Sequence, residues 1–275
     1  DPAEAALARA RRAPPRLQWA RIGSELQAVQ AKFGKATDLG RRRSRFAAAG
    51  DAPEVAPEAL IEREPVTVVC SRMGWIRAMK GHLPLDQDFK FKDGDEGRFA
   101  LHAETTDKLV LFGSNGRFYT LGAHALPGGR GMGEPVRLMI DLPNEARIVD
   151  LFVHRPGVRL IVASSAGDGF LVPADEVLAQ TRAGKQVLNL AEGAQALVCR
   201  PVAGDHVATV GQNRKLLVFA LAELPEMTRG KGVRLQKYKD GGLSDLTTLT
   251  LAQGLKWADP AGRTRHETDL TPWLG

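Results

Sequence analysis

The chain lacks several features that would place it in a specialised class of protein. Only two of its 275 residues are cysteines, Cys70 and Cys199, and they lie far apart in apolar stretches. Two distant cysteines favour a reducing compartment over a disulfide scaffold, although the sequence does not exclude one disulfide between them. No apolar run approaches the roughly 18 residues of a membrane helix, and no charged-then-apolar leader with a cleavage site is present. We therefore expect a cytoplasmic protein with no membrane partner.

Motifs of catalysis and cofactor binding are also missing. The six histidines are scattered, and none has another histidine or a cysteine at metal-ligand spacing. The sequence has no Gly-x-x-x-x-Gly-Lys-Ser/Thr phosphate loop and no Gly-x-Ser-x-Gly nucleophile turn. An acidic stretch at residues 86–96 lacks the ligand order of a calcium loop, so we expect a solvated loop there. The chain is expected to be non-catalytic and to hold no metal or cofactor.

Positive charge is concentrated near the start of the chain. The formal net charge is +6 for the whole sequence. Residues 1–50 contain 11 Lys or Arg and 4 Asp or Glu, which leaves 27 basic and 28 acidic residues for 51–275. The electrostatic part of nucleic-acid affinity scales with the number of phosphates that are neutralised. The nearly neutral body would therefore bind nucleic acid only through local basic patches.

The first 60 residues predict a helix between two irregular segments. Residues 1–15 are rich in Ala and Arg and end in two prolines. Residues 16–35 carry apolar side chains at the spacing of an amphipathic helix, and Gly34 is a typical stop. Residues 36–60 start with an arginine cluster, which is compatible with a solvated linker or with a nucleic-acid contact, and continue as an Ala/Pro-rich linker. The apolar positions of the helix are Trp19, Ile22, Leu26, Val29 and Phe33.

From about residue 61 to 270 the chain repeats one pattern. An apolar run is followed by a short turn and by a second apolar run with a basic or aromatic residue, which is typical of a β-hairpin. The weaker fifth copy pairs residues 246–251 with 255–257. A hairpin period of about 40–50 residues predicts an all-β, propeller-like disc of about five four-stranded blades, with a tail at 271–275. The five turn residues are Gly74, Gly116, Gly169, Arg214 and Gly254.

Loops that combine glycine with arginine or lysine lie between the hairpins. The loop at 127–133 leads into an apolar segment at 136–140, which we expect to be a strand, and the densest basic stretch is 226–239. Glycine lets the backbone approach a ligand, and backbone N–H groups beside Arg or Lys suit phosphate. Any one loop is compatible with an exposed turn and solvated charge, but recurrence in successive modules predicts a positive track along one rim. The candidate DNA-binding residues are Arg72, Arg77, Lys80, Arg117, Arg130, Arg137, Arg182, Lys185, Arg214, Lys215, Arg229, Lys231, Arg234 and Lys237.

One motif closely resembles a known family. Ser71-Arg72-Met73-Gly74-Trp75-Ile76-Arg77-Ala78-Met79-Lys80-Gly81-His82 is similar to the opening of the C-terminal domain of the A subunit of bacterial topoisomerase IV. Residues 126–135, 182–185 and 224–232 resemble later blades of that family in the same order. The resemblance implies a β-pinwheel, whose blades exchange strands with their neighbours. It also implies binding and bending of double-stranded DNA on the rim of the disc.

The resemblance further implies a place within a larger enzyme. The module would steer duplex segments for ATP-dependent strand passage, in decatenation and supercoil relaxation during chromosome segregation. The family's catalytic tyrosine follows an arginine in a winged-helix domain, whereas Tyr119 and Tyr238 lie in β segments here, so binding without cleavage is expected. ATP and Mg²⁺ would act through other domains, and the topoisomerase IV B subunit would complete an A2B2 enzyme in the nucleoid.

Two other functions remain open from the sequence. A gyrase A wrapping domain would carry a Gln-Arg-Arg-Gly-Gly-Lys-Gly box, which residues 128–131 and 229–232 only approximate. This difference favours moderate bending over wrapping. The nearly neutral body is also compatible with a protein-interaction propeller, whose binding would depend less on salt than phosphate binding does. A propeller enzyme would need a convergent polar site, for which the sequence offers no candidate cluster.

Overall fold

The computed structural model describes residues 4–5, 8–9, 14–41, 61–258 and 261–275. The chain divides into two compact units, residues 1–56 and 57–275, and each is described by itself. Most of the linker expected at residues 36–60 lies outside the described part of the chain. None of the described helices combines the length and apolar character needed to cross a membrane.

The first unit contains one long helix, α2, at Pro15–Phe33, where the sequence predicts a helix over residues 16–35. Proline stands in its first turn, where no backbone N–H is needed. At its other end Gly34 donates its N–H to the carbonyl oxygen of Gln30 at 2.7 Å, which caps the last turn. The apolar side chains that the sequence places along one face are exposed within this unit.

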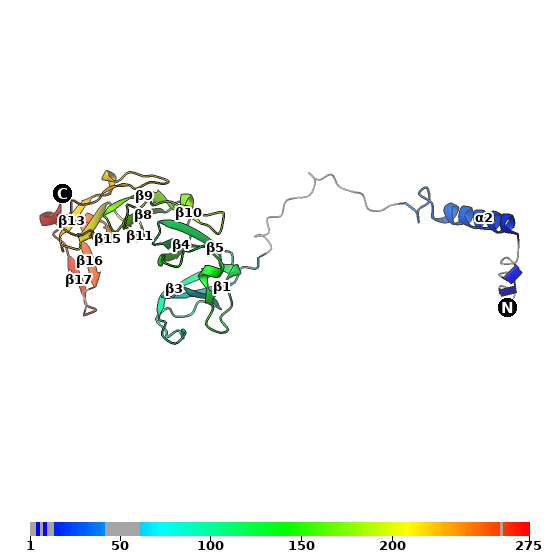
Figure 1. The fold of residues 1–275 in the computed structure, drawn as a ribbon, viewed down its shortest axis with the longest axis horizontal. Helices are drawn as coiled ribbons and strands as arrows, with labels where there is room; N and C mark the ends of the chain where they lie inside the picture. The colour runs from blue at the N-terminus through cyan, green and yellow to red at the C-terminus, as the bar shows by residue number, and fades with distance from the viewer. Residues whose placement is uncertain (1–3, 6–7, 10–13, 42–60, 259–260) are drawn as a thin grey trace. The chain divides into compact units, whose positions relative to one another are not determined.

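The second unit is built from antiparallel sheets that follow one another along the chain (Figure 1). The first sheet has the strand order β3-β1-β2-β6, with bounds Gly97–Glu104, Pro65–Ser71, Trp75–Lys80 and Glu134–Pro135. The second has the order β10-β5-β4-β7, with bounds Lys185–Gln186, Arg117–Gly122, Lys108–Gly113 and Ile148–Val153. The third has the order β11-β8-β9-β14, with bounds Ala196–Pro201, Arg159–Ser164, Asp168–Pro173 and Val233–Arg234. Each sheet is one blade.

The last two modules are smaller. The fourth blade has the order β13-β12-β15, with bounds Leu216–Ala220, His206–Gly211 and Leu243–Leu249. It is followed by a hairpin of β16 (Leu255–Ala258) and β17 (Thr264–Glu267). The β-pinwheel architecture expected from the sequence is confirmed. Across residues 61–258 and 261–275, however, three sheets have four strands, and the fourth and fifth modules contribute three and two.

Short 3-10 helices join these strands. In the second, third and fourth modules, a 3-10 helix directly follows the return strand of the hairpin. They are η2 (Ala123–Ala125), η3 (Val136–Leu138), η4 (Ala174–Val177), η5 (Leu221–Glu223), η6 (Leu251–Gln253) and η7 (Thr271–Trp273). The last of these lies in the segment expected as a tail, where Leu274 also forms a parallel bridge with Val218 of β13.

Two hairpin predictions are wrong in detail. In the third module the left-handed turn residue is Gly167, with φ of 87°, whereas Gly169 pairs with Ala163 inside the hairpin. The turn ends earlier because Gly167 already donates its N–H to Ser164, so that Asp168 begins β9 as a buried polar residue. In the fifth module, residues 246–251 belong to β15 and η6, and the hairpin is formed by β16 and β17.

The apolar strand predicted at 136–140 is also wrong, because this segment contains η3. The N–H groups of Met139 and Ile140 both donate to the carbonyl oxygen of Val136, which closes the segment into a turn. This turn buries Val136 and Ile140 while it leaves Leu138 exposed. An apolar run of this length does not by itself separate a strand from a short helical turn.

Each of the first three blades is completed by residues from the following module. The strands β6, β10 and β14 contain two residues each and pair with β2, β5 and β9. In all three cases the residue before the exchanged strand is a glycine in the left-handed conformation, and its backbone passes close to a carbonyl group of the hairpin. A Cβ atom on Gly133, Gly184 or Gly232 would stand 2.3, 2.6 or 2.2 Å from the carbonyl oxygen of Ile76, Phe118 or Gly169.

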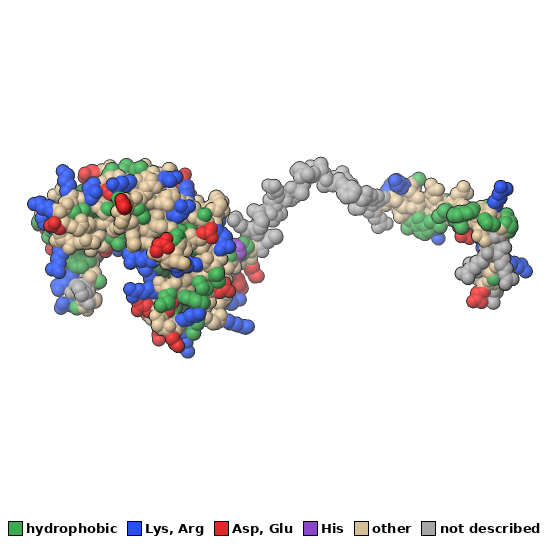
Figure 2. Space-filling view, in the orientation of Figure 1, with side chains coloured by type: hydrophobic (Ala, Val, Ile, Leu, Met, Phe, Trp, Pro, Cys, Tyr) green, Lys and Arg blue, Asp and Glu red, His purple; other side chains and the backbone are tan. Residues whose placement is uncertain are grey.

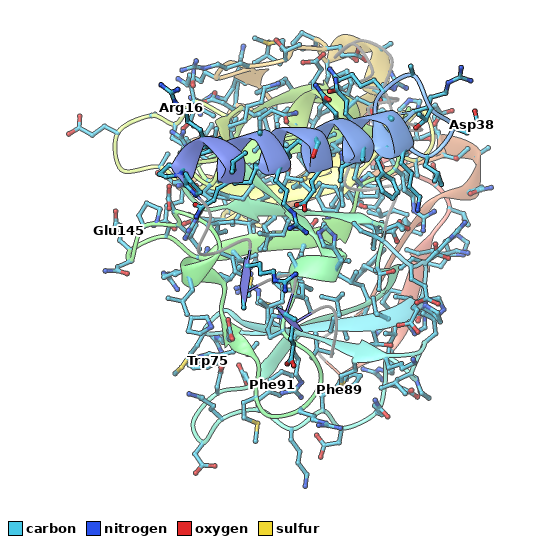
Figure 3. All side chains as sticks on the ribbon, turned by 90° about the vertical axis from the view of Figure 1, so that its right-hand side faces the viewer. Arg16, Asp38, Trp75, Phe89, Phe91 and Glu145 are labelled. Atoms are coloured by element: carbon cyan, nitrogen blue, oxygen red, sulfur yellow. The ribbon has the colours of Figure 1, made fainter. Side chains whose placement is uncertain are left out.

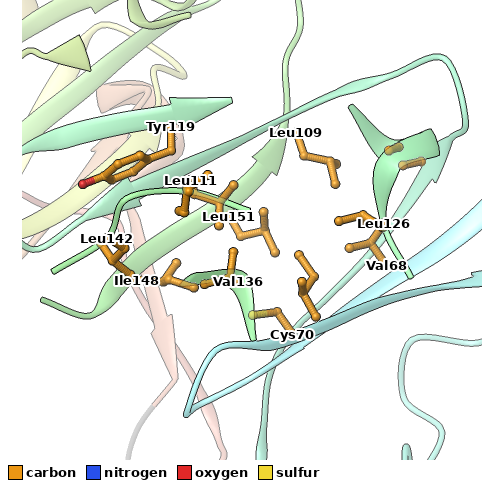
Figure 4. Close-up of a cluster of buried hydrophobic side chains, with 14 of the residues drawn as sticks. Val68, Cys70, Leu109, Leu111, Tyr119, Leu126, Val136, Leu142, Ile148 and Leu151 are labelled. Atoms are coloured by element: carbon orange, nitrogen blue, oxygen red, sulfur yellow. The ribbon is translucent and has the colours of Figure 1, made fainter. Parts of the chain in front are cut away.

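The hydrophobic cores lie between successive blades. Strand β4 contributes Leu109 and Leu111 to the cluster shared with the first blade (Figure 4). Its alternate residues Val110 and Phe112 face the third blade in a second cluster. Successive side chains of a strand point to opposite faces, so a strand that is covered on both faces is apolar at every position. This packing explains the continuous apolar runs of the hairpins.

Two buried thiols belong to these cores, and both cysteines are free. Burial raises the pKa of Cys70 to about 12 and raises the pKa of Cys199 well above its usual value. The folded state therefore favours the neutral thiols. Their contribution to stability is present below the thiol pKa of the unfolded chain and is lost as the pH rises toward the folded values.

We predict that neither thiol reacts with a maleimide at about pH 8 until the chain unfolds. Between about pH 8 and pH 11 the urea midpoint should fall, and it should fall less in the Cys70→Ala/Cys199→Ala double variant. Rapid labelling of the folded chain at either cysteine would contradict this expectation.

A second prediction concerns the glycine that enters the first blade. Gly133→Ala forces a Cβ atom into the Ile76 carbonyl group, so we expect a loss of about 2–4 kcal/mol in the free energy of unfolding. The matched control is Gly131→Ala in the same loop. Gly131 is also left-handed, with φ of 89°, but a Cβ there meets no atom within 4 Å, so only about 1 kcal/mol of backbone strain is expected. Equal losses in urea unfolding would show that the close approach is unimportant.

Candidate nucleic-acid interface

The topology places the basic, glycine-containing loops on the outer side of the blades. Strand β3 contacts β7, β7 contacts β11, and β11 contacts β15, so the strands at one end of each sheet order form the inner side of the unit. At the other end of each order stand the exchanged strands β6, β10 and β14. The loops that lead into these strands are the basic loops singled out from the sequence. They therefore lie at the rim, as the resemblance implies.

Three of the candidate arginines instead hold the protein together. Arg77 is 4% exposed and donates hydrogen bonds to the carbonyl oxygens of Lys90 and Gly131, at 2.6 and 3.1 Å. Its guanidinium carbon lies 5.6 Å from the centre of the Phe91 ring, and Figure 3 shows Trp75 and Phe91 at the same end of the first blade. Burial lowers the pKa of Arg77. The expectation that Arg77 contacts DNA is incompatible with this burial.

Arg117 has the same role at the next junction, and Arg137 anchors the loop that precedes β7. Arg117 donates to the carbonyl oxygens of Ala183 and Gly184 at 2.9 and 3.2 Å, and so fixes the loop that enters its own blade. Arg137 donates to the carbonyl oxygen of Ala146 at 2.7 Å. Both side chains are half-buried and use their donors on the backbone. Their basic character serves loop anchoring, and their donors are already engaged in the folded chain.

Asp168 neutralises two more candidates in the third blade. Its carboxylate is 6% exposed and lies 3.1 Å from the Arg234 Nε and 3.3 Å from the Lys231 Nζ. Arg234 also donates to the carbonyl oxygen of Ala166 at 2.8 Å. The densest basic stretch of the sequence therefore loses much of its free charge. Sequence reasoning missed Asp168, whose acidic side chain stands in the register position that Arg117 has in the second blade.

Four further candidates form ion pairs at the surface. Lys80 pairs with Glu64 at 2.8 Å, Lys185 pairs with Glu176 at 3.4 Å, and Arg72 pairs with Glu96. Arg182 lies 3.8 Å from Asp141 and donates to the carbonyl oxygen of Leu138. Exposed pairs of this kind contribute about 0–1 kcal/mol, so a phosphate can compete for the cation. These side chains are available to a polyanion at a modest cost.

The remaining five candidates are exposed, and their own side chains form no hydrogen bond or ion pair among the described residues. Arg130 and Arg229 stand in the loops that enter the first and third blades, and Lys237 follows β14. Arg214 and Lys215 form the turn of the fourth hairpin, where Arg214 has a φ of 62°. Figure 2 shows Lys and Arg side chains spread over the visible side of the second unit, with acidic side chains between them. Such a surface can contact successive phosphates through separate patches.

One basic cluster was not found from the sequence. The pKa of Arg98 is lowered first by burial and then by the charges of Arg147 and Arg72, so each of these two arginines acts electrostatically on Arg98. Arg98 is the second residue of β3, and Arg147 directly precedes β7, on the inner side of the unit. Their proximity depends on the packing of inner strands from different modules, which no local pattern in the sequence reveals.

Comparison with known proteins gives a consistent result. A sequence family described as the DNA gyrase C-terminal domain, β-propeller, matches residues 107–155, 159–198 and 205–247. The A subunit of DNA topoisomerase 4 from Caulobacter vibrioides is 46% identical over 270 residues, which cover 94% of this chain and 35% of that protein. The protein of the same name from Escherichia coli K12 is 32% identical over 216 residues, covering 78% of this chain and 28% of that protein. The chain thus spans about a third of the length of these relatives.

The fold has a solved counterpart. The structure of the Escherichia coli ParC C-terminal domain superposes with a TM-score of 0.68 at 28% sequence identity. The alignment covers 77% of this chain and 90% of that domain. The sequence similarity and the blade topology therefore point to the same family.

The structural role of Arg77 can be tested against its neighbour Arg72. Arg77→Met leaves two backbone carbonyl groups without their buried donor, so we expect a loss of about 2–4 kcal/mol in unfolding free energy. Arg72→Met removes one exposed pair in the same hairpin and should cost less than about 1 kcal/mol. Urea denaturation of the two variants gives the comparison. Equal stability of the two variants would contradict the structural role of Arg77.

Proposed function

The chain belongs to the family of C-terminal domains of the DNA gyrase and topoisomerase IV A subunits, and from this premise we propose that it binds and bends double-stranded DNA. The observation that carries the proposal is the recurrence of exposed basic loops at the outer edge of successive blades. Arg130 and Arg229 occupy equivalent loops two blades apart, and each is exposed. A duplex that follows the rim would meet these cations in turn.

The mode of binding follows from the spacing of the charges. Lys and Arg on glycine-containing loops suit the phosphate backbone, which carries no base sequence directly. Cations arranged around a curved edge favour a bent duplex, and the cost of the bend is offset by additional phosphate contacts. We therefore propose sequence-tolerant, salt-sensitive bending. Arg77 and Arg117 are bonded to backbone carbonyl groups, and Lys231 and Arg234 are paired with Asp168. These cations are less available to phosphate, which supports a moderate bend over extensive wrapping.

The proposed role within the whole protein extends beyond this chain. The module would position duplex segments for strand passage, in decatenation and relaxation, by an A2B2 enzyme completed by a B subunit in the nucleoid. The ATP and Mg²⁺ chemistry of that enzyme would belong to parts outside this chain. A gyrase-like wrapping role has less support, because the Caulobacter and Escherichia relatives are both named as DNA topoisomerase 4.

The test is a mobility shift with a duplex of about 40 base pairs at two salt concentrations, together with circularly permuted bend probes. The rim variant is Arg130→Glu/Arg229→Glu, which changes two exposed cations whose side chains have no partner among the residues that the structure describes. We expect affinity to fall at least about tenfold and the slope of log affinity against log salt to fall by about two. Lys231 and Arg234 are left unchanged, because reversing them would place acids beside the buried Asp168.

The control carries the same change of charge on the inner side of the unit. Arg147→Glu/Arg155→Glu replaces two exposed arginines that flank β7. This variant should keep the salt slope of the parent chain within about half a unit. Equal losses in the two variants would indicate a general effect of net charge and would count against binding along the rim.

A further inference from the structure

The inner strands of the first three blades meet around a cavity. Strand β3 contacts β7, and β7 contacts β11. The cavity has a volume of about 300 Å³, and all three strands contribute to its wall. The basic loops of the rim stand at the other end of each sheet order. This inner cavity is therefore separate from the surface proposed to contact DNA.

The inner cavity follows from the repetition of the blade. Each of the three inner strands lines it with a residue from an equivalent register position. These residues pair with the first strand of the hairpin in their own blade. The pairs are His102 with Thr67, Val153 with Leu109 and Pro201 with Leu160. Because the same position converges from three blades, the cavity is a product of blade packing and does not depend on one irregular loop.

The wall of the inner cavity is largely apolar. Its buried part is formed by Leu151, Leu160 and Ala174, which are at most 4% exposed. Its half-buried part is formed by Leu101, Phe152 and Val158, which pack at the edges of the first two core clusters. Half-buried apolar side chains around a cavity keep part of their surface in contact with water. Covering that surface with an apolar ligand is favourable.

One positive charge in the wall is unpaired. Arg155 lies in the loop after β7 and is exposed, and its side chain forms no hydrogen bond or ion pair among the described residues. Asp175, next to the lining residue Ala174, is already engaged by the His154 Nε2 and by the N–H of Gly157, each at 3.0 Å. None of the described residues that line the cavity is Asp or Glu. The inner cavity thus combines apolar walls with an available cation.

A second cavity on the inner side has a different chemistry. Its volume is about 540 Å³, and it lies between β7, β11 and β15. Asp150, Arg200 and Asp245 line it, and the Arg200 Nη2 lies 3.1 Å from the Asp245 carboxylate. Its arginine is therefore already paired, and two carboxylates stand in its wall, so it does not suit an anion. The apolar wall with an unpaired cation is a particular property of the cavity between the first three blades.

We propose that the inner cavity binds a small monocarboxylate with an apolar body. The carboxylate would pair with the guanidinium of Arg155, whose planar donors match it geometrically. The apolar body would contact Leu101, Phe152 and Val158. At about 30 Å³ for each group of the size of water, the cavity has room for about ten non-hydrogen atoms. Mostly apolar walls with few polar groups that fix the orientation are typical of small-molecule sites.

The probe for this site is octanoate, which has the required size of about ten non-hydrogen atoms. It is titrated into the whole chain, and binding is followed by calorimetry and by amide chemical shifts. We expect saturable binding with a Kd of about 0.1–1 mM and shifts at Leu101 and Phe152. Octanamide, the neutral isostere, should bind at least about tenfold more weakly, because it offers no charge to Arg155.

A pair of arginine variants tests the charge. Arg155→Met should weaken octanoate binding at least about tenfold and leave octanamide binding unchanged. The matched control is Arg147→Met, which removes an exposed arginine from the opposite end of β7. Its affinity for octanoate should stay within about twofold of the parent chain. Equal affinities of the two variants would overturn the proposal.

A pair of valine variants tests the location. Val158→Phe adds volume at the wall of the cavity and should abolish octanoate binding. Val202→Phe is the control, because Val202 is a half-buried valine of the third core cluster outside this wall. Urea denaturation confirms that each variant folds. Should Val158→Phe not fold, the exposed Arg155 still provides the decisive comparison.

Three outcomes would overturn the proposal. They are the absence of saturable octanoate binding, non-saturable adsorption only, and binding that persists in a folded Val158→Phe variant. Because the inner cavity is separate from the rim, each of these outcomes leaves the proposed DNA binding unaffected. A chain that fails to bind DNA can likewise still bind octanoate, so the two proposals are tested independently.

Discussion

The close approach of a left-handed glycine to a hairpin carbonyl group is the contact on which the joining of the blades depends. In three blades this approach brings a two-residue strand onto the outer edge of the preceding sheet. The bonds that follow are made by the backbone, so the middle residues are free to vary between Glu-Pro, Lys-Gln and Val-Arg. The glycine and the buried Val or Leu are the constant elements. A module therefore acts as a unit of packing only together with the next one.

The same joints account for much of the positive charge in the body of the protein. Arg77 and Arg117 reach from a hairpin to the carbonyl groups of an entering loop. Lys231 of an entering loop and Arg234 of the exchanged strand β14 instead reach back to Asp168. The direction differs, but in each case a cation links two modules that are distant in sequence. Cations used in this way have lost part of their capacity to bind phosphate. Counting Lys and Arg in the sequence consequently overstates the charge that the rim can offer.

The sequence was sufficient for the architecture and insufficient for the partners of individual side chains. Asn115-Gly116 and the apolar runs on either side indicate a hairpin directly, because turn chemistry and alternation are local properties. The burial of Arg77 depends on Lys90 and Gly131, which come from different loops, and no local pattern contains that information. The turn at Gly167 was misplaced because Asp168 resembles a turn residue, and only its pairing with Arg234 explains an acid at the start of a buried strand.

Strand exchange also imposes an order on folding as the chain is synthesised. Trp75 pairs with Pro135, Arg117 with Gln186 and Asp168 with Arg234, so each outer edge waits for a segment 60–69 residues further along. At ribosomal rates of about 5–20 residues per second, the outer edge of each hairpin would stand unpaired for roughly 3–14 s before its exchanged strand is synthesised. During that interval its backbone groups can pair with any extended chain nearby. The open edge is the six-residue strand β2, β5 or β9, of which only two residues later pair with the exchanged strand.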